Sequence, residues 1–221
     1  MSRIFVLSPA DCNGIRARWL LGKSSRVDLA VRLRASGATL GEVFSFLSAL
    51  YFRGKLAYAR AFAEPPSACP GILIITPNAG LMPHDRMIRL AQLRGYSRAS
   101  IDLKNRRYCA TLRQSAKRLG GDIGAECEVV LLGSLATGKY LDILRPIFGC
   151  RLRAPAAFVG LGDMSRGGLL LRSVRENREL DYIDVAVLSA ALVKRSRSNK
   201  CGAATVLEQR SCGDKPDAGR F

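Results

Sequence analysis

The chain has 221 residues, 48% of them hydrophobic, so it can bury a substantial core, and its length fits one domain with at most a tail. No apolar run approaches the roughly 18 residues of a membrane span, and the short run after Arg3 is too brief for a signal peptide, so we expect a cytoplasmic protein without a membrane partner. The seven cysteines are scattered without Cys-x-x-Cys spacing and His84 is the only histidine, which predicts neither a disulfide framework nor a metal site.

Net charge is the strongest bulk signal. The chain carries 35 Lys and Arg against 18 Asp and Glu, a formal net charge of +17. Residues 1–120 hold 20 of these basic and 6 of the acidic side chains, whereas residues 121–221 hold 15 and 12. This asymmetry is typical of a protein that binds a polyanion, most simply a nucleic acid. The alternative is a merely soluble surface whose arginines reflect codon usage.

Local patterns place the first strand and the first helix. Residues 3–7 form a β-branched and aromatic run that ends at Ser8 and Pro9, which is typical of a buried strand that leaves into a loop. Leucines and valines at helical spacing predict a helix over residues 25–36, with Gly37 as its stop. The arginines of this helix are expected on its solvated side.

A long buried helix, or two joined helices, is predicted between Thr39 and Pro65. Thr39 and Glu42 have the spacing of a capping box, and the Pro-Pro pair that begins at Pro65 forbids continuation. Arg53 and Lys55 interleave with aromatic residues, an arrangement that can form a nucleic-acid-binding face. The alternative, which helical spacing favours, is that the aromatic residues belong to the core.

The apolar run over residues 72–76 predicts a fully buried strand, followed by a turn-rich loop. Loops at the carboxyl ends of such strands are where ligands bind in α/β sheets. Asn78, His84 and Asp85 are therefore candidate site residues by position. The alternative is that Asp85 caps a helix that runs to about Gly95, with His84 as a turn residue.

In the second half, predicted strands alternate with predicted helices. We expect strands over residues 99–103, 128–132, 157–160 and 169–174, helices over residues 105–119 and 137–148, and an alternating strand from residue 180 that can run on into a helix. From residue 194 the chain is polar and rich in Gly, Ser and Lys, which predicts a disordered basic tail. The pattern predicts an α/β domain over residues 1–190, with a mixed sheet flanked by helices, and a flexible tail over residues 191–221.

The stretch VVLLGSLATGKY, residues 129–140, has the Gly-x-x-x-x-Gly-Lys spacing of a phosphate-binding loop. That pattern next requires Ser or Thr to reach Mg²⁺, but here Tyr140 follows, and no other apolar strand ends in the Asp that completes such a metal site. Nucleotide hydrolysis is therefore not predicted. We consider a smaller anion, such as a nucleic-acid phosphate, held by Lys139 and the amides at Gly138, with a tight glycine turn and a solvated lysine as the alternative.

A second glycine-rich stretch, GLGDMSRGG over residues 160–168, lacks the spacing of a dinucleotide-binding loop, so no cofactor is predicted. Asp163 and Arg166 stand between two predicted strands in this stretch. They are either ligand contacts or a pair that holds the turn.

The order of these landmarks resembles the bacterial peroxide-stress-response family often called YaaA. The matching pieces span most of residues 4–174 and read LSPA, ILIITPNAGLMPHD, EVVLLGS leading to GKYLDIL, and SRGGLLLRSV. The resemblance implies a compact α/β "cantaloupe" fold, a role in the stress response, DNA rather than RNA as the partner, and a cleft of strand-end loops near which these residues converge: Ser8, Asn78, Gly80, Asp85, Lys139 and Arg166. Asp11 and Met82 stand where the family usually has basic residues, so the resemblance implies no DNA contact at those two positions.

Two main hypotheses follow. In the favoured one, the protein binds nucleic acid through phosphate contacts from Arg53, Lys55, Lys139 and Arg166. The strand-loop pattern is also similar to domains related to tRNA-guanine transglycosylases, which implies the alternative of an enzyme that acts on a nucleobase, nucleoside or nucleotide. Asp85 or Asp163 would then be the nucleophile or general acid. Under either hypothesis, the predicted cleft-lining residues are Ser8, Asn78, Gly80, Ser134 and Gly138. A third class, a structural or interaction protein, would leave these loops unconverged.

Overall fold

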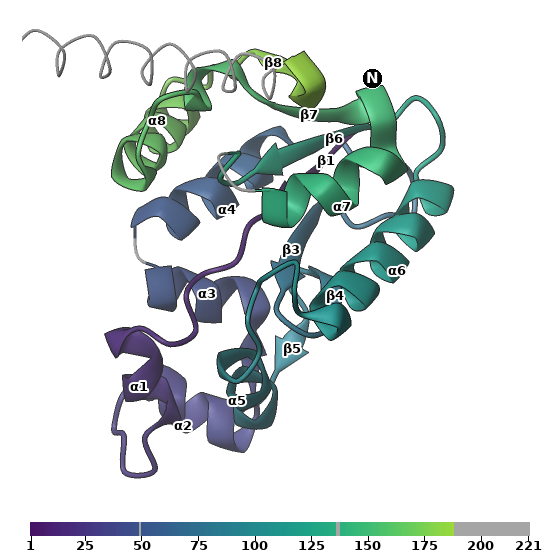
Figure 1. Cartoon of the computed structure of the whole chain (residues 1–221). Coiled ribbons are helices and arrows are strands. Elements are labelled where there is room, and N and C mark those ends of the chain that lie inside the picture. Colours follow the sequence, from purple (N-terminus) through teal and green to yellow (C-terminus); the bar gives the residue numbers. More distant parts are fainter. Residues whose placement is uncertain (49, 136–137, 188–221) are drawn as a thin grey trace, which may run out of the picture.

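A mixed sheet forms the centre of the structure, a computed structural model that describes residues 1–48, 50–135 and 138–187 (Figure 1). Within these residues the sheet has six strands, and the central four are parallel whereas the two edge strands are antiparallel to their neighbours. In spatial order they are β4 (Gly80–Pro83), β3 (Ile72–Thr76), β1 (Arg3–Leu7), β6 (Glu128–Leu132), β7 (Leu152–Pro155) and β8 (Tyr182–Asp184). The predicted α/β fold with a mixed sheet is confirmed, while the predicted tail at 191–221 lies outside the described residues.

The central strands are apolar on both faces because helices cover the sheet on both sides. In β1, Phe5 and Leu7 point to one face, and Ile4 and Val6 point to the other, and all four are buried. The runs in β3 and β6 behave in the same way, so sheet burial explains why these stretches read as continuous hydrophobic segments.

The helices divide unequally between the two faces (Figure 1). One face carries α1 (Ile15–Leu21), α2 (Asp28–Ala35), α3 (Leu40–Ser48), α4 (Leu50–Phe62), α5 (Leu90–Ser97) and α8 (Asp163–Arg175). The other carries α6 (Arg106–Asp122) and α7 (Gly138–Phe148). A small antiparallel pair, β2 (Ala38–Thr39) with β5 (Met87–Ile88), stands apart from the main sheet. None of the described helices is long and apolar enough to span a bilayer.

Helices α4 and α8 cross in close contact through two glycines. A Cβ atom on Gly54 would lie 2.8 Å from the Gly167 carbonyl oxygen, and one on Gly167 would lie 3.0 Å from the Tyr51 Cα atom. Any larger residue at either position would push the two backbones apart. This crossing holds Tyr51 and Lys55 of α4 against the first turn of α8.

Three strand predictions in the alternating pattern are wrong. Residues 169–174 belong to helix α8, where Leu170 is buried against the sheet face that α4 also covers. Residues 157–160 form the end of a short 3₁₀ helix, Ala156–Phe158, and the turn after it, and residues 99–103 form the loop between α5 and α6. A short apolar run has no periodicity that distinguishes a strand from a buried helical turn. Tertiary packing therefore determines the secondary structure of these three segments.

Candidate ligand site at the carboxyl ends of the central strands

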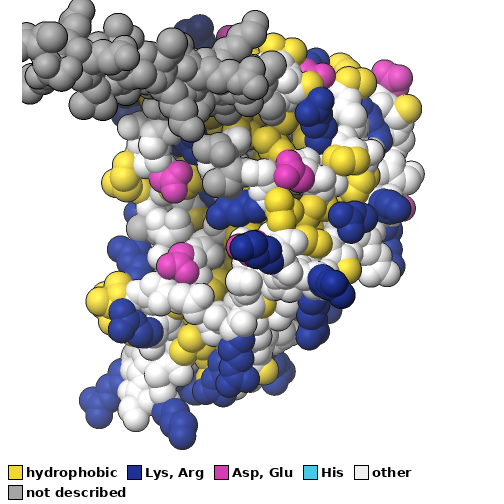
Figure 2. Space-filling view, viewed as in Figure 1, with side chains coloured by type: hydrophobic (Ala, Val, Ile, Leu, Met, Phe, Trp, Pro, Cys, Tyr) yellow, Lys and Arg dark blue, Asp and Glu magenta, His cyan; other side chains and the backbone are white. Residues whose placement is uncertain are grey.

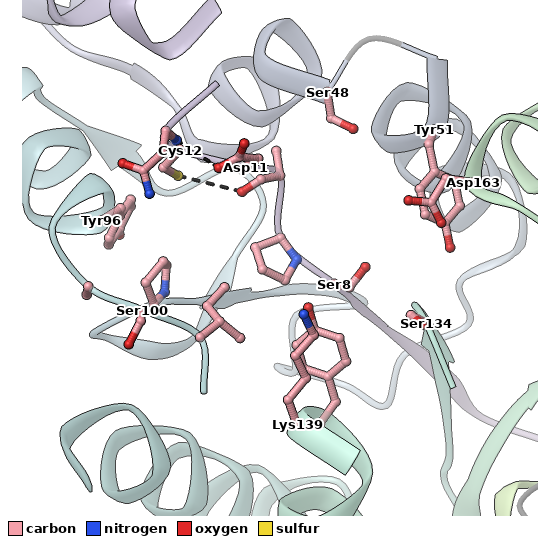
Figure 3. Close-up of a pocket in the computed structure, with 17 residues that line it drawn as sticks. Ser8, Asp11, Cys12, Ser48, Tyr51, Tyr96, Ser100, Ser134, Lys139 and Asp163 are labelled. Atoms are coloured by element: carbon pink, nitrogen blue, oxygen red, sulfur yellow. Dashed lines mark hydrogen bonds between the residues drawn. The ribbon is translucent and has the colours of Figure 1, made fainter. Parts of the chain in front are cut away.

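A cavity of about 460 Å³ lies where the chain changes direction across the sheet. Strand β1 is followed by β3 on one side, and the chain then crosses to β6 on the other side of β1. The carboxyl ends of β1 and β6 therefore form a topological switch point, the place where open α/β sheets bind ligands. The lining residues are Ser8 to Asn13, Ser48, Tyr51, Pro77, Tyr96, Ala99 to Ile101, Ser134, Lys139, Tyr140 and Asp163 (Figure 3).

At one end of the cavity, Ser8, Tyr51, Ser134 and Asp163 face one another although they come from four different elements (Figure 3). Ser8 follows β1 and Ser134 follows β6, so the parallel pairing of the two strands brings these residues together. A Cβ atom on Gly133 would lie 2.9 Å from the Ser8 Cβ atom. Glycine at that position therefore allows the end of β6 to lie directly against Ser8.

Tyr51 presents a buried hydroxyl group to this end of the cavity. Its side chain is 7% exposed, and its Oη atom has no hydrogen-bond partner among the described residues. Burial raises the pKa of Tyr51 to about 12, so the hydroxyl is neutral at physiological pH, and the neighbouring guanidinium of Arg166 opposes this shift. A buried polar group without a partner costs free energy, which a ligand in the cavity would recover.

Lys55 lies beneath Ser8 and is 1% exposed. Its ammonium nitrogen Nζ lies 2.6 Å from the Ser8 carbonyl oxygen and 2.8 Å from Ser8 Oγ, above the rings of Tyr51 and Phe52. Burial lowers the pKa of Lys55 to about 7; the negative charge of Asp163 opposes the shift and the positive charge of Arg166 adds to it. The predicted role of Lys55 on a nucleic-acid-binding surface is wrong, because the side chain does not reach the surface, whereas the aromatic residues of α4 do belong to the core.

Lys139 and Arg166 have different roles although both were predicted to bind anions. The Lys139 side chain enters the cavity toward Ser8 (Figure 3), and it forms no salt bridge with any described residue. Arg166 is buried outside the cavity lining, where its guanidinium donates to the Phe158 carbonyl oxygen at 3.1 and 3.3 Å. Its Nη1 atom lies 3.5 Å from Asp163 within the first turn of α8, so Arg166 fixes the start of this helix.

The structure places the other predicted site residues away from this cavity. Asn78 lines a separate hollow beside α5, and Asp85 is exposed in the turn before β5. Gly80 has a positive φ of 69° and packs against α6, and Gly138 begins α7 without lining the cavity. Arg53 is exposed on α4. Of the predicted residues, the structure therefore brings together Ser8, Ser134, Lys139 and Asp163.

The sequence analysis did not identify several residues that line the cavity. Nothing in the sequence marked Tyr51 as a site residue, because its helical spacing is that of a core residue. Cys12 also lines the cavity, but burial raises the pKa of its thiol to about 12, which leaves it protonated and unreactive near neutral pH. Within the described ranges, no group of three His, Cys, Asp or Glu side chains is placed to hold a metal ion.

A basic lobe borders the opposite end of the cavity. We use this name for α1, α2, α5 and the start of α6, where α5 packs against α1 and α2. Figure 2 shows Lys and Arg side chains gathered over this lower part of the molecule. Its exposed cations are Arg18, Lys23, Arg26, Arg34, Arg86, Arg89, Arg94, Arg98, Lys104, Arg106 and Arg107. The segments that lead into α1 and out of α5, residues 8–13 and 96–101, supply cavity walls, so the lobe and the cavity adjoin.

Comparison of the chain with protein-family models, with curated proteins and with solved structures gives no match.

Proposed function

We propose that the cavity binds a small polar ligand of the nucleoside or nucleotide class. The observation that carries the proposal is the buried Tyr51 hydroxyl, which has no hydrogen-bond partner among the described residues and belongs to a side chain that lines a cavity at the topological switch point. A volume of about 460 Å³ is within the usual range for small-molecule sites. This proposal follows the alternative hypothesis of the sequence analysis, in which an enzyme holds a nucleobase, nucleoside or nucleotide in a cleft at the strand ends.

The lining explains the choice of ligand class. Tyr96 and Ile101 offer an aromatic and an apolar wall against which a base can stack, while Lys139 offers a cation to a phosphate group. The serine hydroxyls at both ends supply donors and acceptors for a sugar or a base edge. Together these groups match a ligand with one flat apolar part and one anionic part.

The test is a panel of nucleosides, nucleoside monophosphates and inorganic phosphate, measured by thermal shift and calorimetry. Tyr51→Phe should weaken binding of the best ligand about fivefold, the value of one hydrogen bond, without lowering the stability of the free protein. Lys139→Ala should weaken the binding of nucleoside monophosphates about tenfold and leave the affinity for nucleosides unchanged. The proposal fails if no member of the panel binds, or if Tyr51→Phe binds as well as the wild type.

Tyr58→Phe is a matched control for the tyrosine variant. The Tyr58 hydroxyl is 2.7 Å from that of Tyr182 and accepts a hydrogen bond from the Leu180 backbone at 2.8 Å, outside the cavity. Its removal should lower stability by about 1 kcal/mol and leave ligand affinity unchanged. The two variants thus separate a ligand contact from a structural one.

Nucleic-acid binding through the basic lobe is a second candidate. The supporting observation is the set of exposed cations on the lobe, among which Asp28, Asp85 and Asp102 are the exposed acidic residues described. Phosphate contacts predict an affinity that falls steeply with salt and little sequence preference, with DNA favoured over RNA. The paired change Arg94→Ala and Arg98→Ala should reduce the salt slope by about 2. Undetectable binding to DNA and RNA at low salt would rule this candidate out. The resemblance to the YaaA family stays a prediction.

A further inference from the structure

The backbone of the sheet fixes Ser8 at the floor of the cavity. The Ser8 amide donates to the Leu132 carbonyl oxygen at 3.0 Å, which continues the pairing of β1 with β6, and the Ser8 carbonyl oxygen accepts from Lys55 at 2.6 Å. The side chain is largely buried but lines the cavity, with its hydroxyl toward the end that Tyr51 and Asp163 share (Figure 3). A group held by a central strand has little freedom to leave a reactive geometry.

The surroundings of Lys55 favour a neutral amine. In the structure Lys55 Nζ donates to the Ser8 carbonyl oxygen at 2.6 Å and to Ser8 Oγ at 2.8 Å. A neutral amine has two N–H donors and one lone pair, so after losing a proton Lys55 can keep its bond to the carbonyl oxygen and accept the Ser8 hydroxyl proton. The charged groups that act on this site come from α8, namely Asp163 and Arg166, and the groups of α4 that face it are the rings of Tyr51 and Phe52. No described carboxylate forms a salt bridge with Lys55. With a pKa of about 7, Lys55 is half deprotonated at neutral pH.

Other candidates for a base or nucleophile are less suited. His84, the only imidazole, lies in the turn after β4 and does not line the cavity. The Cys12 thiol is kept protonated by burial, which raises its pKa to about 12. A serine hydroxyl becomes a nucleophile only when an adjacent base removes its proton, and Lys55 is the base within hydrogen-bond reach of Ser8.

We propose that Ser8 and Lys55 form a catalytic dyad that hydrolyses an ester or thioester bound in the cavity. This inference goes beyond ligand binding and does not require the ligand to be a nucleotide.

In the first half-reaction, Ser8 Oγ bonds to the carbonyl carbon while its proton passes to Lys55 Nζ. Collapse of the tetrahedral adduct breaks the bond to the leaving alcohol or thiol, which takes the proton from Lys55. In the second half-reaction, water adds to the Ser8 ester, loses a proton to Lys55, and releases the carboxylic acid as that proton returns to Ser8.

The experiment uses the full chain and a neutral activated ester, p-nitrophenyl acetate. Released nitrophenol gives the rate, and peptide mass spectrometry of acid-quenched samples locates the acetyl group. We expect acetyl on the peptide that contains Ser8, and a rate that rises with pH around a midpoint near 7 as Lys55 loses its proton. Ser8→Ala should abolish the adduct, and Lys55→Met should lower its rate of formation about 100-fold or more and remove the midpoint. Ser24→Ala, in an exposed loop, is the matched control and should behave as the wild type.

Thermal unfolding checks that each variant is folded, and Ser8→Cys gives an independent test if Lys55→Met is not. A thiol in place of the hydroxyl should still be acetylated, because it occupies the same position. The dyad is refuted if acetyl appears only at other residues, if folded Lys55→Met reacts as fast as the wild type, or if both Ser8→Cys and the wild type remain unmodified. Because the ester is neither nucleotide nor anion, a failed nucleotide panel would leave this result unaffected.

Discussion

Substitution of Gly167 by Ala tests the close crossing of α4 and α8. The added Cβ would lie 3.0 Å from the Tyr51 Cα atom and 3.2 Å from its backbone nitrogen, and neither atom can move without moving α4. Such overpacking costs about 1–3 kcal/mol. Alanine also gains up to about 1 kcal/mol over glycine from helix propensity, so the single variant measures the difference of two effects.

The neighbouring Gly168→Ala variant isolates the packing effect. A Cβ atom at this position of α8 meets nothing within 4 Å, so only the propensity gain remains. Urea unfolding followed by circular dichroism should therefore find Gly167→Ala less stable than Gly168→Ala by about 1–3 kcal/mol. Equal stability of the two variants would show that the helices are not in backbone contact at Gly167 and would remove the argument for how Tyr51 is positioned.

Three further predictions concern pH, thiol reactivity and a turn. Burial lowers the pKa of Lys55 to about 7, so between pH 7 and the ordinary lysine pKa the unfolded chain binds more protons than the folded protein. The free energy of unfolding should therefore rise over this range by up to about 1.4 kcal/mol per pH unit, and Lys55→Met should lose this slope. Iodoacetamide at pH 8 should label exposed Cys150 well before buried Cys12, as peptide mapping can measure, and equal rates would contradict the burial of Cys12. Gly80→Ala and Gly124→Ala share positive φ angles, but only a Cβ at Gly80 meets neighbours, including the Thr111 carbonyl oxygen at 2.5 Å. Urea unfolding should find Gly80→Ala less stable by at least about 1 kcal/mol, and equal losses would refute the packing of this turn.

Strands β1, β3 and β6 and most helices could be predicted because the local composition indicates their burial, whereas β7 and α1 were not predicted. The run in β6 is apolar at successive positions, which is the pattern expected of a strand covered on both faces. Helix α8 could not be predicted in the same way. Its Leu169 to Leu171 run follows two glycines, and its packing partner, Gly54, is more than a hundred residues earlier in the chain.

The candidate site was predictable only in part. Ser8, Ser134 and Lys139 follow strands or begin a helix after one, so the rule that ligands bind at strand ends was enough to find them. Tyr51 and Lys55 lie within a helix whose pattern is that of a core element, and no local signal marks a buried lysine as different from a solvated one. Their roles follow from the crossing of α4 and α8, which is a tertiary feature.

The cavity combines a fixed floor with separate walls. Ser8 directly follows the central strand and Lys55 belongs to a long helix, whereas Asp11, Asn13 and Ser100 are exposed loop residues in the cavity walls. Substitutions in those loops can therefore alter which molecule fits without displacing the Ser8 and Lys55 pair. For protein engineering, this means that selectivity can be randomised at the loop positions in a library while the floor is kept constant, and each library member keeps the same sheet and the same reactive geometry.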